Sequence, residues 1–219
     1  MEKMSIITPT QKLILNQIAT SQFIKANFYF TGGTALSEFY LQHRFSDDLD
    51  FFSEKTFNFD LVLQEINSLA KRFDFTFVRQ QREVVHMYTL KFKNNENLKL
   101  DFGFYPYPRV KKGLNYSGII VDSLFDIAIN KLTTINQRSS IKDFVDLYFL
   151  LDKFTIWDLI EGVKVKFRME LEPWILGSDL GYVVKDFQTL PKMIKPLTLV
   201  ELKNFFRKKA EELGKKAVL

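Results

Sequence analysis

Two short segments are the most informative about the fold: TGGTAL at residues 31–36 and RFSDDLDFF at residues 44–52. The first follows the apolar run Phe28–Phe30 and precedes an apolar helical pattern, so its glycine pair lies at a strand-to-helix turn. The second alternates acidic and apolar residues from Asp48 onward, which is the period of a β-strand. The two segments therefore predict a strand, a glycine turn, a helix and then a second strand that carries acids.

The glycine pair is a candidate phosphate-binding turn. Gly32 and Gly33 would let the backbone approach a phosphate closely with its amide hydrogens, and Thr34 could add a hydroxyl donor. The following helix would contribute the positive end of its dipole. The alternative is a tight turn built from residues that commonly occupy turns.

Asp48 and Asp50 are the candidate metal ligands. Residues i and i+2 of a strand point to the same face, so the two carboxylates face one way and Leu49 faces the other. Neighbouring carboxylates repel each other, and a divalent cation relieves that repulsion. Oxygen ligands without His or Cys suit Mg²⁺ or Mn²⁺. The alternative is a solvent-exposed face of an edge strand.

Asp101 is the third candidate acid, within the apolar strand pattern of residues 98–105. If this strand lies beside the one that bears Asp48 and Asp50, three carboxylates meet. Such a set can hold two Mg²⁺ ions and support in-line phosphoryl transfer. Asp122 and Asp126 are the competing candidates for the third acid.

The composition excludes several classes of protein. The 219 residues contain no Cys and two His, which excludes disulfide scaffolds and thiolate metal sites. The N-terminus lacks a signal-peptide pattern, and no apolar run approaches ~18 residues, so we expect a cytoplasmic protein without a membrane span. The net charge of +5 permits an anionic partner. The 23 phenylalanines indicate an aromatic core.

The chain divides by pattern into two parts. Residues 1–121 mix helix and strand signals and are expected to form an α/β lobe, and residues 122–219 are expected to form a helical lobe packed against it. The expected helices span 9–24, 35–41, 60–73, 124–132, 141–151, 156–167, 180–190 and 198–213. The expected strands span 28–30, 48–52, 73–78, 84–92, 98–105 and 116–121.

These motifs in this order resemble the AbiEii-type nucleotidyltransferase toxin family, within the DNA polymerase beta-like nucleotidyltransferase superfamily. The resemblance adds DIAINKL at 126–132, Arg138 and KDFVDL at 142–147 to the two segments above, and it spans residues 28–151. Gly33 stands where many members of the superfamily have Ser. The resemblance implies an α+β fold: a nucleotidyltransferase-like mixed sheet with flanking helices, followed by a C-terminal helical lobe.

The resemblance also implies a role for each matching residue. Asp48, Asp50 and Asp101 would ligate the metal and, with Lys131, form the catalytic set. The implied nucleotide-binding residues are Gly32, Gly33, Thr34, Arg44, Ser46 and Lys131, and secondary candidates are Arg138, Asp143 and Asp146. For Arg44 the alternative is a surface charge, and for Asp143 and Asp146 it is acids that stabilise a helix N-terminus.

The predicted function is transfer of a nucleoside monophosphate from an NTP to an acceptor. The resemblance favours RNA, and tRNA in particular, as acceptor, with the chain as toxin of a toxin–antitoxin or abortive-infection system and an antitoxin as partner. The basic run Arg207-Lys208-Lys209 could follow RNA phosphates or form a solvated helix face. The alternatives are nucleotidylation of a small molecule or protein, and a non-catalytic nucleotide- or partner-binding module.

Overall fold

The computed structural model describes residues 5–138, 140–183 and 186–216, which form two compact units. The first unit contains the chain through Tyr40 together with Ser46–Ser123. The second contains Leu41–Phe45 together with the chain from Leu124 onward. The predicted division into an α/β lobe over residues 1–121 and a helical lobe over residues 122–219 packed against it stays a prediction. The two units are described in turn.

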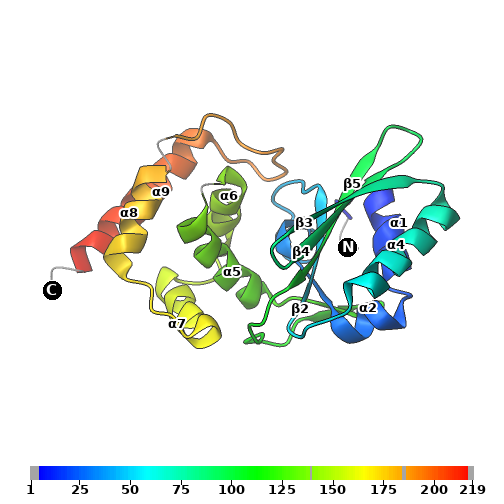
Figure 1. The fold of residues 1–219 in the computed structure, drawn as a ribbon. Helices are drawn as coiled ribbons and strands as arrows, with labels where there is room; N and C mark the ends of the chain where they lie inside the picture. The colour runs from blue at the N-terminus through cyan, green and yellow to red at the C-terminus, as the bar shows by residue number, and fades with distance from the viewer. Residues whose placement is uncertain (1–4, 139, 184–185, 217–219) are drawn as a thin grey trace. The chain divides into compact units, whose positions relative to one another are not determined.

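The first unit is built on a seven-stranded mixed sheet with the order β3-β4-β5-β2-β1-β7-β6. The pairs β2–β5 and β1–β7 are parallel, and the other neighbours are antiparallel. A mixed sheet with helices confirms the predicted α+β class (Figure 1). The strands are β1 (Tyr29–Thr31), β2 (Asp48–Ser53), β3 (Thr76–Arg82), β4 (Val85–Lys91), β5 (Asn97–Phe104), β6 (Leu114–Tyr116) and β7 (Ile119–Val121).

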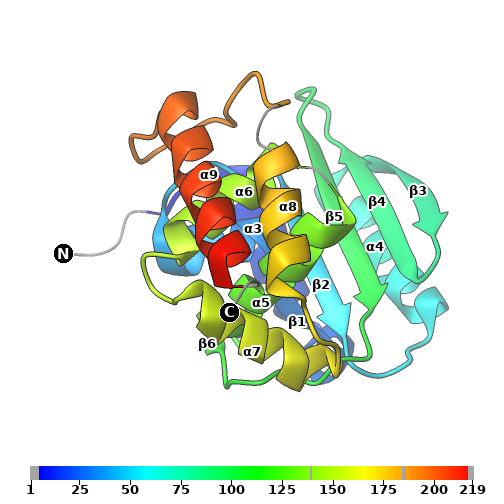
Figure 2. The ribbon, with the colours of Figure 1, turned by 90° about the vertical axis from the view of Figure 1, so that its left-hand side faces the viewer.

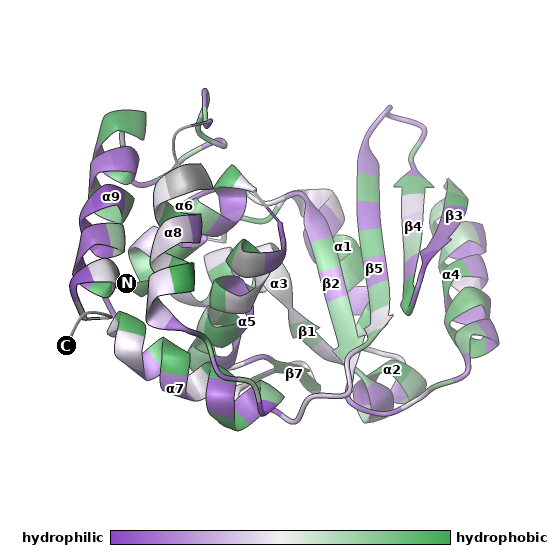
Figure 3. Cartoon of the chain, turned by 60° about the vertical axis from the view of Figure 1, so that its left-hand side comes forward, coloured by the Kyte–Doolittle hydropathy of each residue, from purple (hydrophilic) through white to green (hydrophobic). Residues whose placement is uncertain are grey.

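One face of this sheet is aromatic and covered by helices. Phe30, Phe51 and Phe102 lie side by side in register across β1, β2 and β5, and His86 of β4 continues the row. Phe59 of α4 (Phe59–Phe73) stacks on His86, with 3.6 Å between the ring centroids. Helices α1, α2 and α4 lie on this side of the sheet (Figure 1). The alternation of hydrophobic and hydrophilic residues along β2 and β5 is visible in Figure 3, and it leaves the acids on the opposite face.

The expected single helix over residues 9–24 is wrong, because the chain forms α1 (Pro9–Ile18) and α2 (Gln22–Asn27) instead. The side chain of Thr8 caps the first helix. The side chain of Ser21 accepts a hydrogen bond from the Ile24 amide and begins the second helix. A serine cap inside an apolar periodic pattern therefore restarts the helix after three residues.

The expected strand over residues 116–121 is also wrong, because this segment is the β6–β7 hairpin. Ser117 and Gly118 join the strands and both have positive φ, at 52° and 92°. Two successive residues with positive φ are typical of the type I′ turn, whose twist matches that of an antiparallel pair. Gly118 is therefore the residue in the sequence that indicates a hairpin here.

The second unit is helical, as predicted for this half of the sequence. Helices α8 and α9 lie side by side in it (Figure 2). The helix expected over 180–190 is shifted: α8 begins at Pro173, where a proline suits the first helical turn, and ends at Val183. Residues 184 and 185 lie outside the described residues, and 186–190 are not helical. The helices are α5 (Leu124–Gln137), α6 (Ile141–Leu150), α7 (Ile156–Phe167), α8 (Pro173–Val183) and α9 (Leu199–Lys216).

Throughout the residues that the structure describes, no helix combines the length and the apolar character needed to cross a bilayer.

Candidate active site

The candidate acids share one face of the sheet in the first unit. Asp50 of β2 lies in parallel register with Asp101 of β5, and Asp48 lies beside Lys99. On its other side Asp50 is in register with Thr31 of β1. The strand of Asp101 is therefore the direct neighbour of the strand of Asp48 and Asp50, which is the condition under which three carboxylates share a site.

Lys99 lies among these acids and was not among the residues singled out from the sequence. Its Nζ is 2.8 Å from Asp101 Oδ2 and 3.8 Å from Asp48 Oδ2. Lys99 precedes Asp101 by two residues in the same strand, so both side chains emerge on one face. That spacing within an apolar strand was the signal that could have identified it.

Asp101 is the most buried of the three acids. Burial raises the pKa of its carboxyl, while the hydrogen bond from Lys99 opposes this effect. Burial works against the charge of Lys99, but the surrounding Asp101, Asp48 and Asp50 raise its pKa overall. Asp101 Oδ1 is buried and accepts no hydrogen bond. This carboxylate therefore has one oxygen bound to an ammonium and one without a partner.

The sheet face that bears Asp48, Asp50 and Asp101, here called the acidic face, offers the type of ligand atom that a divalent cation prefers. All three candidates are carboxylates, which Mg²⁺ and Mn²⁺ prefer, and the Asp101 oxygen without a partner is a vacant acceptor. Within the described ranges, however, no three Asp, Glu or His side chains are grouped closely enough to hold an ion as they are placed. An ion bound here therefore requires the carboxylates to turn toward it.

The glycine pair touches the acidic face directly. Gly32 has φ of +78°, and a Cβ added to it would lie 2.0 Å from Asp50 Oδ2, so both its backbone and its surroundings require glycine. Thr34 is buried, and its hydroxyl donates to the backbone carbonyl of Asp48. The helix predicted to begin at Ala35 begins at Gly32 instead, as α3 (Gly32–Ala35), and continues as a π-helix over Leu36–Leu41.

The two competing acids have other partners. Asp122 is fully buried, and its Oδ2 accepts a 2.9 Å hydrogen bond from the Thr31 hydroxyl. Asp126 belongs to the second unit, where its carboxylate lies 2.9 Å from the Lys166 ammonium. Of the three candidates for the third acid, Asp101 is the one in register with Asp50.

Four of the predicted residues form a buried ionic cluster in the second unit together with His43, which the sequence did not single out. We call it the Asp146 cluster; its members are His43, Arg44, Lys131, Asp143 and Asp146. Arg44 reaches the two carboxylate oxygens of Asp146 through Nε at 2.6 Å and Nη2 at 2.8 Å. His43 Nε2 is 2.7 Å from Asp146 Oδ1, and Lys131 Nζ is 2.5 Å from Oδ2. Asp146 therefore compensates several buried donors at once.

Asp143 contacts both the buried Lys131 and the exposed Arg138. Its Oδ1 lies 2.6 Å from Lys131 Nζ, and its Oδ2 accepts a 3.0 Å hydrogen bond from Arg138 Nε, which is exposed. Arg44 is 2% exposed, so the alternative of a surface charge is wrong. Asp143 and Asp146 are also buried, and their contacts go beyond stabilising a helix end. Ser46 is in the first unit, where its carbonyl accepts a 2.8 Å hydrogen bond from Gln11 Nε2.

The comparisons with known proteins agree with these motifs. A family model described as "Nucleotidyl transferase AbiEii toxin, Type IV TA system" matches residues 13–217. The chain belongs to the AbiEii nucleotidyltransferase toxin family. An uncharacterized Aquifex aeolicus (strain VF5) protein, aq_aa25, is 34% identical over 193 residues, which covers 85% of this chain and 87% of that protein.

Two solved structures share the fold of this chain. MenT4, a nucleotidyltransferase toxin from Mycobacterium tuberculosis H37Rv, matches with a TM-score of 0.63 and 19% identity, covering 93% of this chain and 81% of that chain. JHP933 from Helicobacter pylori matches with a TM-score of 0.56 and 22% identity, covering 94% and 89%. The predicted family, fold class and enzyme class are confirmed: this AbiEii member is a nucleotidyltransferase.

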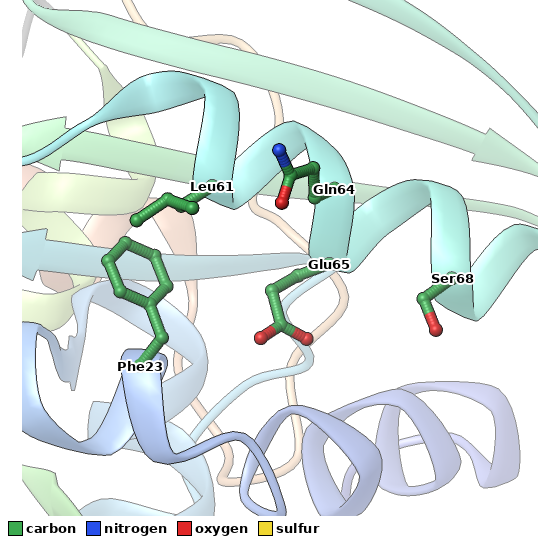
Figure 4. A pocket seen from close by; sticks show the side chains of 5 residues that line it. All are labelled: Phe23, Leu61, Gln64, Glu65 and Ser68. Carbon is green, nitrogen blue, oxygen red and sulfur yellow. The ribbon is translucent and has the colours of Figure 1, made fainter.

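A hollow elsewhere in the first unit of this AbiEii member lies away from the acids. It has a volume of about 300 Å³ and is lined by Phe23 of α2 and by Leu61, Gln64, Glu65 and Ser68 of α4. Figure 4 shows Phe23 pointing toward Leu61 at one end. Both helices lie on the aromatic side of the sheet, opposite the acidic face, so this hollow does not form part of the candidate site (Figure 1).

The histidines of this AbiEii member predict a loss of stability in mild acid. Burial lowers the pKa of His43 below its usual 6.5, and burial with the nearby Arg79 does the same for His86. Each histidine stays neutral to a lower pH in the folded chain than in the unfolded chain, so stability falls as the pH drops through about 6.5, where the unfolded chain takes up protons. Each histidine contributes a slope of up to about 1.4 kcal/mol per pH unit.

Urea unfolding at about pH 7.5, 6.5 and 5.5 measures this slope. His43→Gln keeps a polar side chain without a titrating group, and we expect it to retain only the part of the slope that His86 contributes. A free energy of unfolding that is constant from neutral to mildly acidic pH would contradict the prediction.

Proposed function

We propose that this AbiEii-type nucleotidyltransferase transfers a nucleoside monophosphate from an NTP to RNA, with tRNA as the favoured acceptor, in a Mg²⁺-dependent reaction. The observation that carries the proposal is the parallel register of Asp50 with Asp101 on the face that also bears Asp48. Family membership supports the NTP substrate, a divalent metal in general and an antitoxin partner. The choice of metal, of acceptor and of site residues belongs to this proposal.

In the proposed reaction an acceptor hydroxyl attacks the α-phosphorus of the NTP. The new bond joins that oxygen to phosphorus, the bond from the α-phosphorus to the bridging oxygen breaks, and pyrophosphate leaves. A divalent ion held by Asp48, Asp50 and Asp101 would lower the pKa of the attacking hydroxyl and neutralise phosphate charge. The hydroxyl proton passes to a general base, and Asp101 is the proposed base where it does not ligate the ion.

Gly32 and Gly33 are proposed to bring backbone amides to the phosphates. The contact between Gly32 and the Asp50 carboxylate supports this role, because a phosphate bound at the turn would be adjacent to the metal ligands. The Thr34 hydroxyl donates to the Asp48 carbonyl, so we assign it to holding β2 against the turn.

Lys131 is proposed to contact the triphosphate as a point charge suited to phosphate. Its ammonium is buried between two carboxylates in the structure, so this role requires it to leave them. Asp143 and Asp146 hold its ammonium from two sides, and Arg44 in turn fixes Asp146. We therefore revise the expected role of Arg44 from nucleotide binding to positioning: its guanidinium is engaged by Asp146 and by the Phe45 carbonyl.

An RNA-labelling experiment tests the acceptor. The purified chain is incubated with total cellular RNA, Mg²⁺ and each of four α-labelled NTPs in turn, beside reactions that contain a chelator. We expect label in a discrete RNA band from one preferred NTP, and none with the chelator. The net positive charge and the exposed Arg207 and Lys208 on α9 support RNA. Label in the protein or in a small molecule instead would overturn the RNA assignment.

A further inference from the structure

Lys99 places a positive charge among the three carboxylates that the proposed function assigns to a metal. Its ammonium hydrogen-bonds Asp101 at 2.8 Å and lies 3.8 Å from Asp48. Asp50 also contributes to the electrostatic environment of this ammonium. A cation of the protein itself therefore already compensates the charges that a bound cation would compensate.

We propose that Lys99 is a built-in counter-ion of the acidic face, and that its ammonium competes with the divalent ion for Asp48 and Asp101. In the metal-free chain Lys99 stabilises the acids. When the ion binds, the ammonium leaves Asp101, and the flexible side chain carries its charge toward the anionic substrate. This inference rests on the proposed metal site, but it concerns a residue to which that proposal assigns no role.

The geometry explains why such a counter-ion is needed. Asp48, Asp50 and Asp101 emerge on one face of adjacent strands, and Asp101 is largely buried. Unpaired carboxylates in such a place are costly, because burial removes water and their charges repel each other.

The ammonium is also removable. The Lys99 side chain is 36% exposed, so the ammonium can return to water without a fully buried intermediate. Asp101 Oδ1 has no hydrogen-bond partner and could accept an arriving ion while Oδ2 still holds Lys99. Exchange can therefore proceed stepwise, with Asp101 compensated throughout.

The test is Mn²⁺ binding, followed by the electron paramagnetic resonance signal of the free ion, in the nucleotide-free protein. Lys99→Met removes the competing charge with a side chain of similar length, and we expect it to bind Mn²⁺ on the order of tenfold more tightly than the wild type. Lys99→Arg keeps the charge and should bind like the wild type or more weakly. Lys91→Met, at the exposed last residue of β4, removes a lysine from the same sheet and should not change binding.

Thermal unfolding supplies a second readout. Without metal, Lys99→Met should unfold at a lower temperature than the wild type, and Mn²⁺ should raise its unfolding temperature by more than it raises that of the wild type. If the variant does not fold without metal, refolding in the presence of Mn²⁺ should recover it.

Three results would overturn the inference: Mn²⁺ affinity of Lys99→Met equal to that of the wild type, an equal metal-induced stabilisation, or failure of Mn²⁺ to recover an unfolded variant. Asp50→Asn separates this failure from failure of the proposed function. If it binds Mn²⁺ like the wild type, the acids are not the metal site and the proposed function loses its basis. If it loses Mn²⁺ while Lys99→Met is unchanged, only the role of Lys99 is wrong.

Discussion

Asp50→Asn should abolish nucleotide transfer, lowering the rate on the order of 10³-fold or more, while the protein stays folded. Asp50 is the central acid of the face, in register with Asp101 on one side and with Thr31 on the other. Its carboxylate also contacts Gly32, so it connects the proposed metal site with the proposed phosphate turn. Asparagine has nearly the same shape but lacks the negative charge that attracts a divalent ion.

The measurement is the rate of label transfer from the preferred α-labelled NTP at saturating Mg²⁺, with the unfolding temperature recorded in parallel. Asp74→Asn is the matched control: Asp74 is an exposed acid in the same unit with positive φ, which asparagine tolerates, and its partner is the exposed Lys93. The control should transfer label at the wild-type rate. Transfer by folded Asp50→Asn within tenfold of the wild type would remove this acid from the mechanism.

The local structure around the acids could be predicted because it depends on patterns of a few neighbouring residues. The alternation in Asp48-Leu49-Asp50-Phe51 predicts a strand with its acids on one face, and β2 has this burial pattern. The glycine pair predicts a strand-to-helix junction, and β1 runs directly into α3 there. These features depend on neighbouring residues, so a single sequence is enough to find them.

Two of the differences have a common physical cause. The expected helix over 9–24 and the expected strand over 116–121 each continue across a residue that ends one element and begins the next. Ser21 and Gly118 do this through a side-chain cap and a positive φ. Apolar periodicity continues through such sites, so capping and turn chemistry must be examined separately.

The periodicity of apolar and polar residues cannot predict which residues far apart in the sequence contact each other. Arg44 and Asp146 are 102 residues apart, and no local pattern indicates that the guanidinium of one binds the carboxylate of the other. The sequence likewise does not show that β2 and β5 are neighbours. The three-carboxylate site was predicted only on the condition that they are. Lys99 is different, since its two-residue spacing from Asp101 is local and places both on one face.

Asp146→Ala should destabilise the second unit by about 3–5 kcal/mol, the usual cost of removing one partner from a buried ion pair. Asp146 is fully buried and contacts His43, Arg44 and Lys131 through its two oxygens. Lys131 retains Asp143, but Arg44 loses its bidentate partner while 2% exposed. The uncompensated guanidinium therefore accounts for most of the expected loss, which urea unfolding measures. Asp152→Ala, an exposed acid just after α6, is the matched control and should change stability by less than about 0.5 kcal/mol.

A double-mutant cycle with Arg44→Met separates lost attraction from unpaired charge. Met fills part of the arginine volume without a charge, so Arg44→Met in the Asp146→Ala background should restore some stability, and the two losses should add to more than the loss in the double variant. Losses that add to within about 0.5 kcal/mol would show that the pair is not coupled.

Acid unfolding gives an independent measure of the same cluster. The desolvation of Asp146 opposes its charge, but Lys131, Arg44 and His43 more than offset this and hold its pKa well below the usual 3.8. The folded chain keeps Asp146 charged while the unfolded chain takes up a proton, so its contribution is complete above about pH 4 and is lost as the pH falls further. The difference in free energy of unfolding between the wild type and Asp146→Ala should therefore narrow below about pH 4. A difference that persists unchanged to about pH 2 would show that lost packing, and not lost charge, destabilises the variant.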